Sequence, residues 1–238
     1  MNDFLSQLEW VLDTHEGSTA SLYDQVAPHY ETFRQLWIEL AGQQAEQAML
    51  GDLAEILVGS PTVLDAGCGT GAMTREVIAF CPEARVTLVD ASEGMLAQAG
   101  DLGERRLQAD LAELPFADES FDVVVCAWVI ETVPDPKAVV TELLRVLKPK
   151  GHLLYTFCSL PDGVLSRAAT ALFRNRVTEG FAGEFLHAED TPWHDCPRSR
   201  RFKSDVGLST YILLRKCCAV EPGVLPPVGP EDVPQTLL

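Results

Sequence analysis

The sequence has few basic residues, and this shortage limits its partners. Lys and Arg number 18 against 35 Asp and Glu in 238 residues, for a formal net charge of −17. A surface field of that sign repels phosphate groups. We therefore expect no nucleic acid and no anionic membrane surface as a partner.

Long apolar runs are also lacking. The opening residues, MNDFLSQLEW, contain no basic segment that leads into an apolar stretch. No apolar run reaches the roughly 18 residues that a membrane-spanning helix needs. These features predict a cytoplasmic protein without membrane insertion.

Paired cysteines are the third absence. The seven cysteines are an odd set without C-x-x-C spacing, which fits neither a disulfide framework nor a zinc site: Cys68, Cys81, Cys126, Cys158, Cys196, Cys217 and Cys218. We expect free thiols, mostly small core residues, and no metal. For the adjacent Cys217 and Cys218, a place at a strand end is favoured over binding of a soft ion.

The distribution of apolar residues divides the chain into three segments. Residues 1–58 carry apolar positions at helical spacing and predict a helical lead-in and lid. Residues 59–218 form the predicted core. Residues 219–238 are a tail with five prolines, which we expect to be disordered because proline lacks a backbone donor.

Short apolar runs alternate with helical stretches from Pro61 onward, which predicts an α/β fold with a doubly wound sheet. The strand candidates are TVLDAG, VTLVD, RLQADL, FDVVVCAWVI and GHLLYTFCS, followed by a late antiparallel strand in GLSTYILLRK. Asp135 and Pro136 predict a helix start. A further helix is expected over residues 164–187 and a loop between Asp190 and Ser204.

The most informative motif is the strand-to-helix loop VLDAGCGTG. Gly67, Gly69 and Gly71 lack the Cβ atoms that would block a ligand lying across the strand end. A dinucleotide site favours G-x-G-x-x-G, whereas this spacing is G-x-G-x-G. Asp65, two residues before the first glycine, suits a ligand with an ammonium group.

Two further acids follow the next strand candidates. Asp90 ends VTLVD, where a carboxylate can hold both ribose hydroxyls of NAD or of another adenosine ligand. Asp110 follows the third strand candidate and can accept a hydrogen bond from an adenine amino group. Asp is common after strands, but three acids at successive strand ends indicate a binding edge.

Together with a D-x-x-x-LPF segment and LLRVLKPKGHLL, these motifs resemble the class I S-adenosylmethionine-dependent methyltransferases of the type 11 and ubiquinone/menaquinone-biosynthesis-like family. The resemblance spans roughly residues 20–160 and implies a Rossmann-like sheet and S-adenosylmethionine as cofactor. By resemblance, the three glycines pass under the cofactor, Asp65 helps to organise its amino-acid end and Asp90 holds the ribose. The remaining cofactor-binding positions implied are Ser92 in the Asp90 motif, Met95 on the adenine, Asp110 and the Leu111 amide at its edge, and the Cys126 carbonyl at the amine.

The segment YDQVAPHY resembles the family's lead-in to the cofactor site. The resemblance places Tyr23 near the cofactor and Tyr30 over the mouth, where a lid would exclude water. Aromatic packing between helices is the alternative for Tyr30.

The acceptor side departs from the family. Glu131 stands where many relatives carry a histidine before a V-P-D turn, so it is a candidate base or cation holder; a carboxylate at a helix entry is the alternative. His29 is the second catalytic candidate. The candidate acceptor pocket also includes Tyr30, Trp128, Phe157, His187, Trp193 and His194.

Three functions remain open at this point. The first is C-, O- or N-methylation of a small molecule, the second methylation of a thiol or metalloid, and the third a non-catalytic cofactor-binding partner subunit. The intact loop and acids argue against the third, and the glycine spacing disfavours an NAD dehydrogenase. The acceptor is not readable, and both a monomer and a homodimer are compatible with the sequence.

Overall fold

A computed structural model gives the structure of the chain and describes residues 18–160, 185–187, 199–205 and 207–216. Among these residues, seven strands form one sheet in the order β3-β2-β1-β4-β5-β7-β6. The first five strands are parallel, whereas β7 is antiparallel to β5 and β6. The strands are β1 (Thr62–Ala66), β2 (Arg85–Asp90), β3 (Arg105–Gln108), β4 (Phe121–Ala127), β5 (Leu147–Cys158), β6 (Ser199–Lys203) and β7 (Ser209–Arg215).

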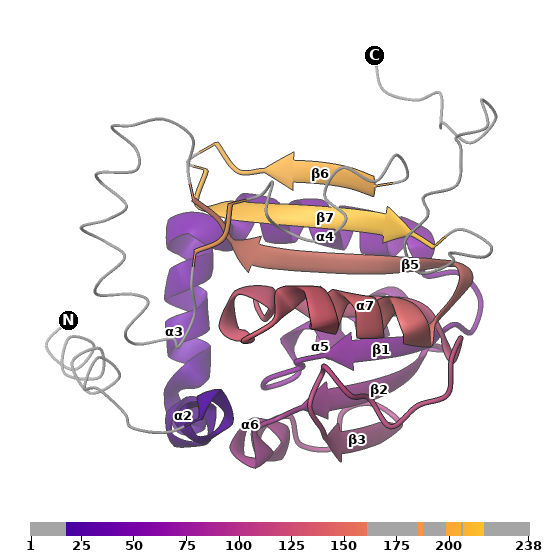
Figure 1. Ribbon diagram of the computed structural model, residues 1–238, viewed down its shortest axis with the longest axis horizontal. Helices are drawn as coiled ribbons and strands as arrows, with labels where there is room; N and C mark the ends of the chain where they lie inside the picture. The colour runs from indigo at the N-terminus through magenta and orange to yellow at the C-terminus, as the bar shows by residue number, and fades with distance from the viewer. Residues whose placement is uncertain (1–17, 161–184, 188–198, 206, 217–238) are drawn as a thin grey trace, which may run out of the picture.

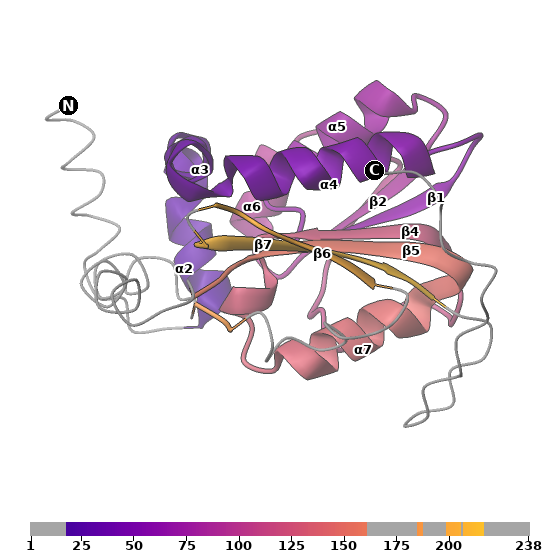
Figure 2. The same cartoon turned by 90° about the horizontal axis from the view of Figure 1, so that it is seen from above.

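Helices cover both faces of the sheet, which confirms the doubly wound arrangement. Figure 2 shows α4 and α5 on one face and α7 on the other. The helical segments are α2 (Thr19–Val26), the 3₁₀ turn η1 (Ala27–His29), α3 (Tyr30–Trp37), the π-helical turn η2 (Ile38–Gly42), α4 (Gln43–Ile56), α5 (Ala72–Phe80), α6 (Glu93–Gln98), the 3₁₀ turn η3 (Ile130–Thr132) and α7 (Pro136–Val146). None of the described helices is both long and apolar enough to cross a membrane.

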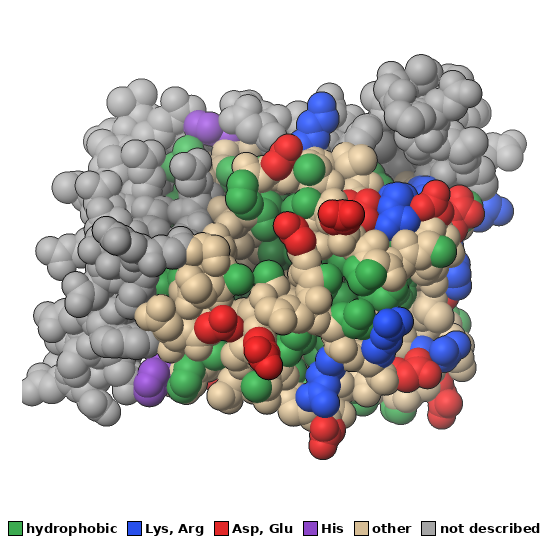
Figure 3. All heavy atoms as spheres, turned by 60° about the horizontal axis from the view of Figure 1, so that its bottom comes forward, with side chains coloured by type: hydrophobic (Ala, Val, Ile, Leu, Met, Phe, Trp, Pro, Cys, Tyr) green, Lys and Arg blue, Asp and Glu red, His purple; other side chains and the backbone are tan. Residues whose placement is uncertain are grey.

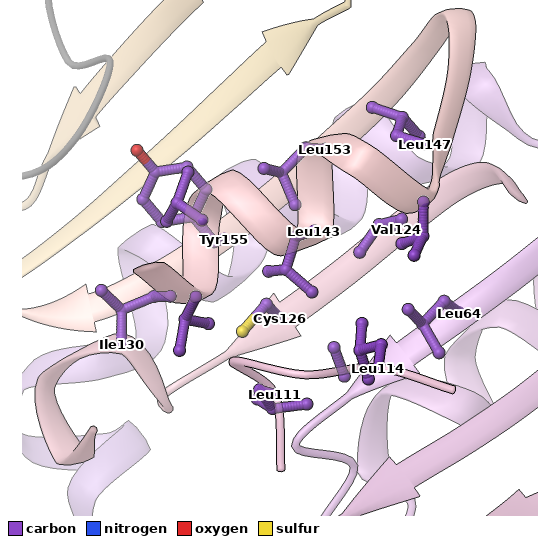
Figure 4. Close-up of a cluster of buried hydrophobic side chains, with 14 of the residues drawn as sticks. Leu64, Leu111, Leu114, Val124, Cys126, Ile130, Leu143, Leu147, Leu153 and Tyr155 are labelled. Atoms are coloured by element: carbon purple, nitrogen blue, oxygen red, sulfur yellow. The ribbon is translucent and has the colours of Figure 1, made fainter. Parts of the chain in front are cut away.

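The expected start of α7 is confirmed in atomic detail. The Asp135 side chain accepts a hydrogen bond from the Ala138 backbone N–H at 3.0 Å, and Pro136 is the first helical residue. The helix buries an apolar stripe that includes Leu143, which points toward Cys126 and Val124 on β4 (Figure 4). A Leu-to-Ala truncation at such a position costs about 2–5 kcal/mol of folding free energy.

The strand predicted over FDVVVCAWVI is too long. β4 ends at Ala127, because Trp128 takes a φ of 62° that a strand cannot contain. The chain then enters η3. The turn directs Trp128 and its neighbours away from the sheet at the carboxyl end of β4.

Two expectations for the later chain are wrong where the structure describes it. Residues 199–203, expected in a loop, form edge strand β6. Its sequence SRRFK has no apolar run to reveal it, and charged residues are typical of sheet edges. Of the helix expected over 164–187, the structure describes only residues 185–187. Within these three residues, Leu186 forms a β-bridge with Ser159.

The parallel strands end at the same edge of the sheet. In Figure 1, β1, β2 and β5 point toward the side on which α2 and α3 stand. The strand order reverses between β1 and β4, and ligands of open α/β sheets bind at such a switch point. The helices that precede β1 therefore lie over the edge where a ligand is expected.

Candidate functional site

The glycine loop after β1 is shaped by close approaches. Gly67 has a φ of 70°, and a Cβ added to it would lie 2.4 Å from Cγ2 of Val129. Gly69 faces an open space, where an added Cβ would find its nearest heavy atom, on the Tyr30 ring, at 3.8 Å. The loop therefore packs tightly at Gly67 and leaves room for a ligand at Gly69.

Asp90 ends β2 and fixes this loop. Its Oδ2 accepts the Gly69 N–H at 2.8 Å, and its Oδ1 accepts the Ser92 N–H at 2.9 Å. Burial raises the pKa of Asp90, and the backbone donors oppose that rise. Because a carboxylate has about four lone-pair sites, two or so remain for a ligand.

A cavity of about 450 Å³ opens at the carboxyl ends of β1, β2, β3 and β4. Ten of the residues predicted from the sequence line it: Tyr23, Tyr30, Gly67, Gly69, Asp90, Ser92, Met95, Asp110, Leu111 and Trp128. The structure thus brings the glycine loop and two of the three acids to one space.

Tyr23 and Tyr30 cover the cavity from α2 and the start of α3. Their rings meet edge to face with centroids 6.1 Å apart. Burial raises the pKa of both phenols, so both are neutral at pH 7. The pair is placed as a lid would be.

The N-terminal helices are held to the core by polar contacts that the sequence did not reveal. Asp24, beside Tyr23, accepts hydrogen bonds at Oδ1 from the Ser92 hydroxyl at 2.6 Å and from the Gly94 N–H at 2.9 Å. Glu31, beside Tyr30, accepts a hydrogen bond from the Thr70 hydroxyl in the glycine loop. Both contacts join segments far apart in the sequence, so local pattern gives no signal for them.

Asp65, the third acid, lies beneath the loop and does not line the cavity. It is 1% exposed, and its Oδ2 accepts the Thr74 hydroxyl at 2.6 Å. Burial raises its pKa to about 6, although the Thr74 hydrogen bonds oppose the rise. Gly71 and Cys126 likewise lie behind the wall; Ala127, next to Cys126, lines it.

Glu131 lies behind the cavity wall, between η3 and the end of β5. Its Oε1 accepts the Cys158 N–H at 3.0 Å, while Oε2 is buried and has no hydrogen-bond partner. Burial raises the pKa of this carboxyl. Asp135 caps α7, so Glu131 is not the cap of that helix; it lies in the first turn of η3.

The other acceptor candidates are scattered. His29 is exposed in η1, and Phe157 is fully buried on the α7 side of the sheet, stacked on Tyr155. His187 is partly exposed near β5, and neither histidine lines the cavity. Trp193 and His194 lie outside the described residues.

Neither cysteine chemistry nor metal binding is built into the described part of the chain. Its cysteines are Cys68, Cys81, Cys126 and Cys158, all free. Burial raises the pKa of the Cys68, Cys126 and Cys158 thiols. Within the described ranges, no three His, Cys, Asp or Glu side chains gather as a metal site.

Charge on the described surface is mixed. On the face in Figure 3, basic side chains lie beside acidic ones. In the described part of the chain, Arg85 pairs with Glu104 and Arg106 pairs with Asp101. The charged side chains that line the cavity are both acidic, Asp90 and Asp110. A cationic or neutral ligand suits such a lining better than an anion.

Comparison with known proteins places this fold and site in a family. Residues 64–155 match the model of a methyltransferase domain. A ubiquinone/menaquinone biosynthesis C-methyltransferase of Syntrophotalea carbinolica is 35% identical over 171 residues, covering 69% of this chain and 71% of the relative. A demethylmenaquinone methyltransferase of Clavibacter sepedonicus is 29% identical over 202 residues, 77% of this chain and 79% of the relative.

Solved structures agree on the fold. A S-adenosylmethionine-dependent methyltransferase of Thermotoga maritima, described as a possible histamine N-methyltransferase, superposes with a TM-score of 0.60 at 20% identity, covering 82% of this chain and 98% of that one. The chain belongs to the S-adenosylmethionine-dependent methyltransferases of the ubiquinone/menaquinone-biosynthesis type.

Proposed function

We propose that the cavity binds S-adenosylmethionine and that the protein transfers its methyl group to a small-molecule acceptor. The observation that carries the proposal is the lining of the cavity. It joins the glycine loop after β1, Asp90 after β2 and Asp110 after β3, beneath Tyr23 and Tyr30. These groups match a ligand made of an amino acid, a ribose and an adenine.

The residues present fit this ligand. The bare Gly69 leaves space that a side chain would fill, and Asp90 retains lone pairs for the ribose hydroxyls. Met95 is buried at the cavity floor, where its apolar side chain can pack on the adenine, with Asp110 and the Leu111 amide at the adenine edge. Asp65 supports the loop from beneath and carries the charge for the amino-acid end.

The chemistry that S-adenosylmethionine supplies when bound is a methyl group on a positively charged sulfur, open to in-line displacement. The chain contributes position and exclusion of water, which account for much of the acceleration in such a transfer. Tyr23 and Tyr30 close the space, and Trp128 forms its wall beside β4. The acidic lining is compatible with the cofactor's positive charge.

For the acceptor, we propose a neutral ring that carries hydroxyl groups. The two relatives described above are named for menaquinone or ubiquinone biosynthesis, and the aromatic wall of Tyr30 and Trp128 suits a flat apolar ring. A thiol or metalloid acceptor is supported less, because the described cysteines are separate and buried. A non-catalytic partner role gains no support from an intact cofactor cavity.

Calorimetry and a methylation assay test the proposal. We expect binding of S-adenosylmethionine and S-adenosylhomocysteine with little affinity for NAD. Labelled S-adenosylmethionine incubated with quinol, phenol, amine and thiol acceptors then identifies the acceptor class. Tight NAD binding without a response to S-adenosylhomocysteine would contradict the assignment.

A further inference from the structure

Glu46 joins two elements of the cavity although it does not line the cavity itself. It lies on α4 and is 9% exposed. Its Oε2 accepts the indole N–H of Trp128 at 3.0 Å. Both of its carboxylate oxygens accept from Nη2 of Arg34 at 2.8 Å.

Both hydrogen-bond partners of Glu46, Trp128 and Arg34, lie at or near the cavity. Trp128 lines the cavity directly. Arg34 is on α3 four residues after Tyr30, one helical turn away, and Tyr30 also lines the cavity. A single carboxylate thus lies between the lid helix and the wall.

Trp128 needs such support because its backbone is strained. A φ of 62° is rare for a bulky residue and persists only where the surroundings impose it. The backbone N–H donates to the Thr156 carbonyl at 3.0 Å, and the ring meets Trp37 edge to face at 5.9 Å. Gly42 gives it room, since an added Cβ would lie 3.0 Å from Cζ2 of the indole.

We propose that Glu46 is a positioning residue that couples the lid helix α3 to the Trp128 wall, so that cofactor affinity depends on a carboxylate outside the cavity. The inference rests on the proposed function, because it takes the cavity as the cofactor site. It predicts that neutralising Glu46 loosens Tyr30 and Trp128 together. A merely structural role would lower stability and leave affinity unchanged.

Asp52 provides a matched control on the same helix. It is 8% exposed, accepts the Tyr211 hydroxyl at 2.8 Å and pairs with Arg200. It therefore repeats the chemistry of Glu46, with a buried carboxylate between an aromatic donor and an arginine. Neither Tyr211 nor Arg200 lines the cavity.

The experiment compares Glu46→Gln, Arg34→Met and Asp52→Asn with the unaltered full chain. Calorimetry with S-adenosylhomocysteine gives the affinity, and thermal melting gives the stability. Spectra of ¹⁵N-tryptophan-labelled protein report the indole N–H groups of the four tryptophans, with Trp128→Phe identifying the Trp128 resonance. Arg34→Met keeps the question answerable if Glu46→Gln does not fold.

We expect Glu46→Gln and Arg34→Met to weaken S-adenosylhomocysteine binding about fivefold or more, the lower end of ordinary coupling between sites. Glu46→Gln should also move the Trp128 indole resonance. Asp52→Asn should leave the affinity and the Trp128 indole resonance unchanged, although it lowers the melting temperature about as much as Glu46→Gln does. Unaltered affinity in Glu46→Gln, or equal weakening by Asp52→Asn, would overturn the coupling alone, whereas no binding by the unaltered protein would overturn the proposed function.

Discussion

Asp90 shows how one carboxylate can hold both a loop and a ligand. Its two oxygens accept the N–H groups of Gly69 and Ser92, and the residue also lines the cavity. We expect Asp90→Ala to weaken S-adenosylhomocysteine binding by about 1.5–3 kcal/mol, the range for hydrogen bonds to charged groups. Calorimetry on the folded variant checks this. Unchanged affinity together with a lower melting temperature would show that Asp90 has only a structural role.

We expect Asp65 to make the stability of the protein depend on pH. Burial raises its pKa to about 6 in the folded state. The folded protein therefore retains a proton that the unfolded chain loses near pH 4, so stability falls as the pH rises from about 4 to about 6. A shift of about two pKa units corresponds to about 3 kcal/mol.

Asp65→Asn should remove this dependence, because an amide oxygen can still accept the Thr74 hydrogen bond without carrying charge. Melting temperatures of both proteins between pH 4 and pH 8 check the expectation. The variant should gain stability relative to the unaltered chain toward pH 8. Parallel curves would show that Asp65 titrates normally.

The structure places Glu131, a candidate base from the sequence, behind the cavity wall. Because Oε2 is shut off from solvent and Oε1 accepts the Cys158 N–H, we expect Glu131 to shape the wall and not to take a proton from the acceptor. Glu131→Gln keeps an acceptor for the Cys158 N–H, so cofactor affinity and melting temperature should be retained and turnover should change less than about tenfold. A turnover loss of about 10²–10⁴-fold, measured with an identified acceptor, would instead assign Glu131 as the base.

At the scale of elements, the local sequence pattern predicted helices and strands best where helix capping and burial of apolar residues act together. The strand β1, the glycine loop and the start of α7 follow from short-range chemistry: apolar runs, glycines and the Asp135-Pro136 pair. β6 could not be predicted in this way, because SRRFK becomes a strand only by pairing with β7. The end of β4 was missed for a similar reason, since the turn at Trp128 depends on Gly42, Trp37 and Glu46 from distant helices.

The residues of the candidate site were predicted or missed for the same reason. Residues of the glycine loop and the strand-end acids were predicted, because one motif places them at one edge of the sheet. Asp24, Glu46 and the shielded position of Glu131 were missed, since each depends on contacts between distant segments. Acceptor residues expected from type alone, such as His29 and Phe157, point elsewhere.

The contact between α2 and α6 should control how well the lid closes. Asp24→Ala removes acceptors for the Ser92 hydroxyl and the Gly94 N–H, at a cost of about 1 kcal/mol in folding free energy. Because Tyr23 is the adjacent residue on α2, we expect S-adenosylhomocysteine to bind more weakly as well. Calorimetry and melting check this, with Asp24→Asn as the control that keeps the side-chain oxygen; equal weakening in both would show that charge, and not the hydrogen bonds, matters.

At the scale of the whole molecule, the sequence carries an acidic surplus, and the charged side chains that line the cavity are acidic as well. A net charge of −17 disfavours anionic ligands generally, and the described cavity adds no basic side chain to reverse that preference. Neutral rings and amines are therefore easier to admit as acceptors than carboxylates. The net charge affects which ligands enter the cavity, whereas Tyr30 and Trp128 affect which ligands fit inside it.

The last strand of the sheet that the structure describes is β7. β7 ends at Arg215, and Lys216 closes the sheet by donating its backbone N–H to the Gly151 carbonyl at 2.9 Å. We propose that the folding unit ends near residue 218 and that the proline-rich segment beyond it contributes little burial. Deletion of residues 221–238 should therefore leave melting temperature and S-adenosylhomocysteine affinity nearly unchanged, although it removes three acidic side chains. Melting, calorimetry and sedimentation on the full and shortened chains check this. A large loss of stability that depends on protein concentration would place the segment in contact with a second copy of the chain. A large loss that does not depend on concentration would place the segment on the domain itself.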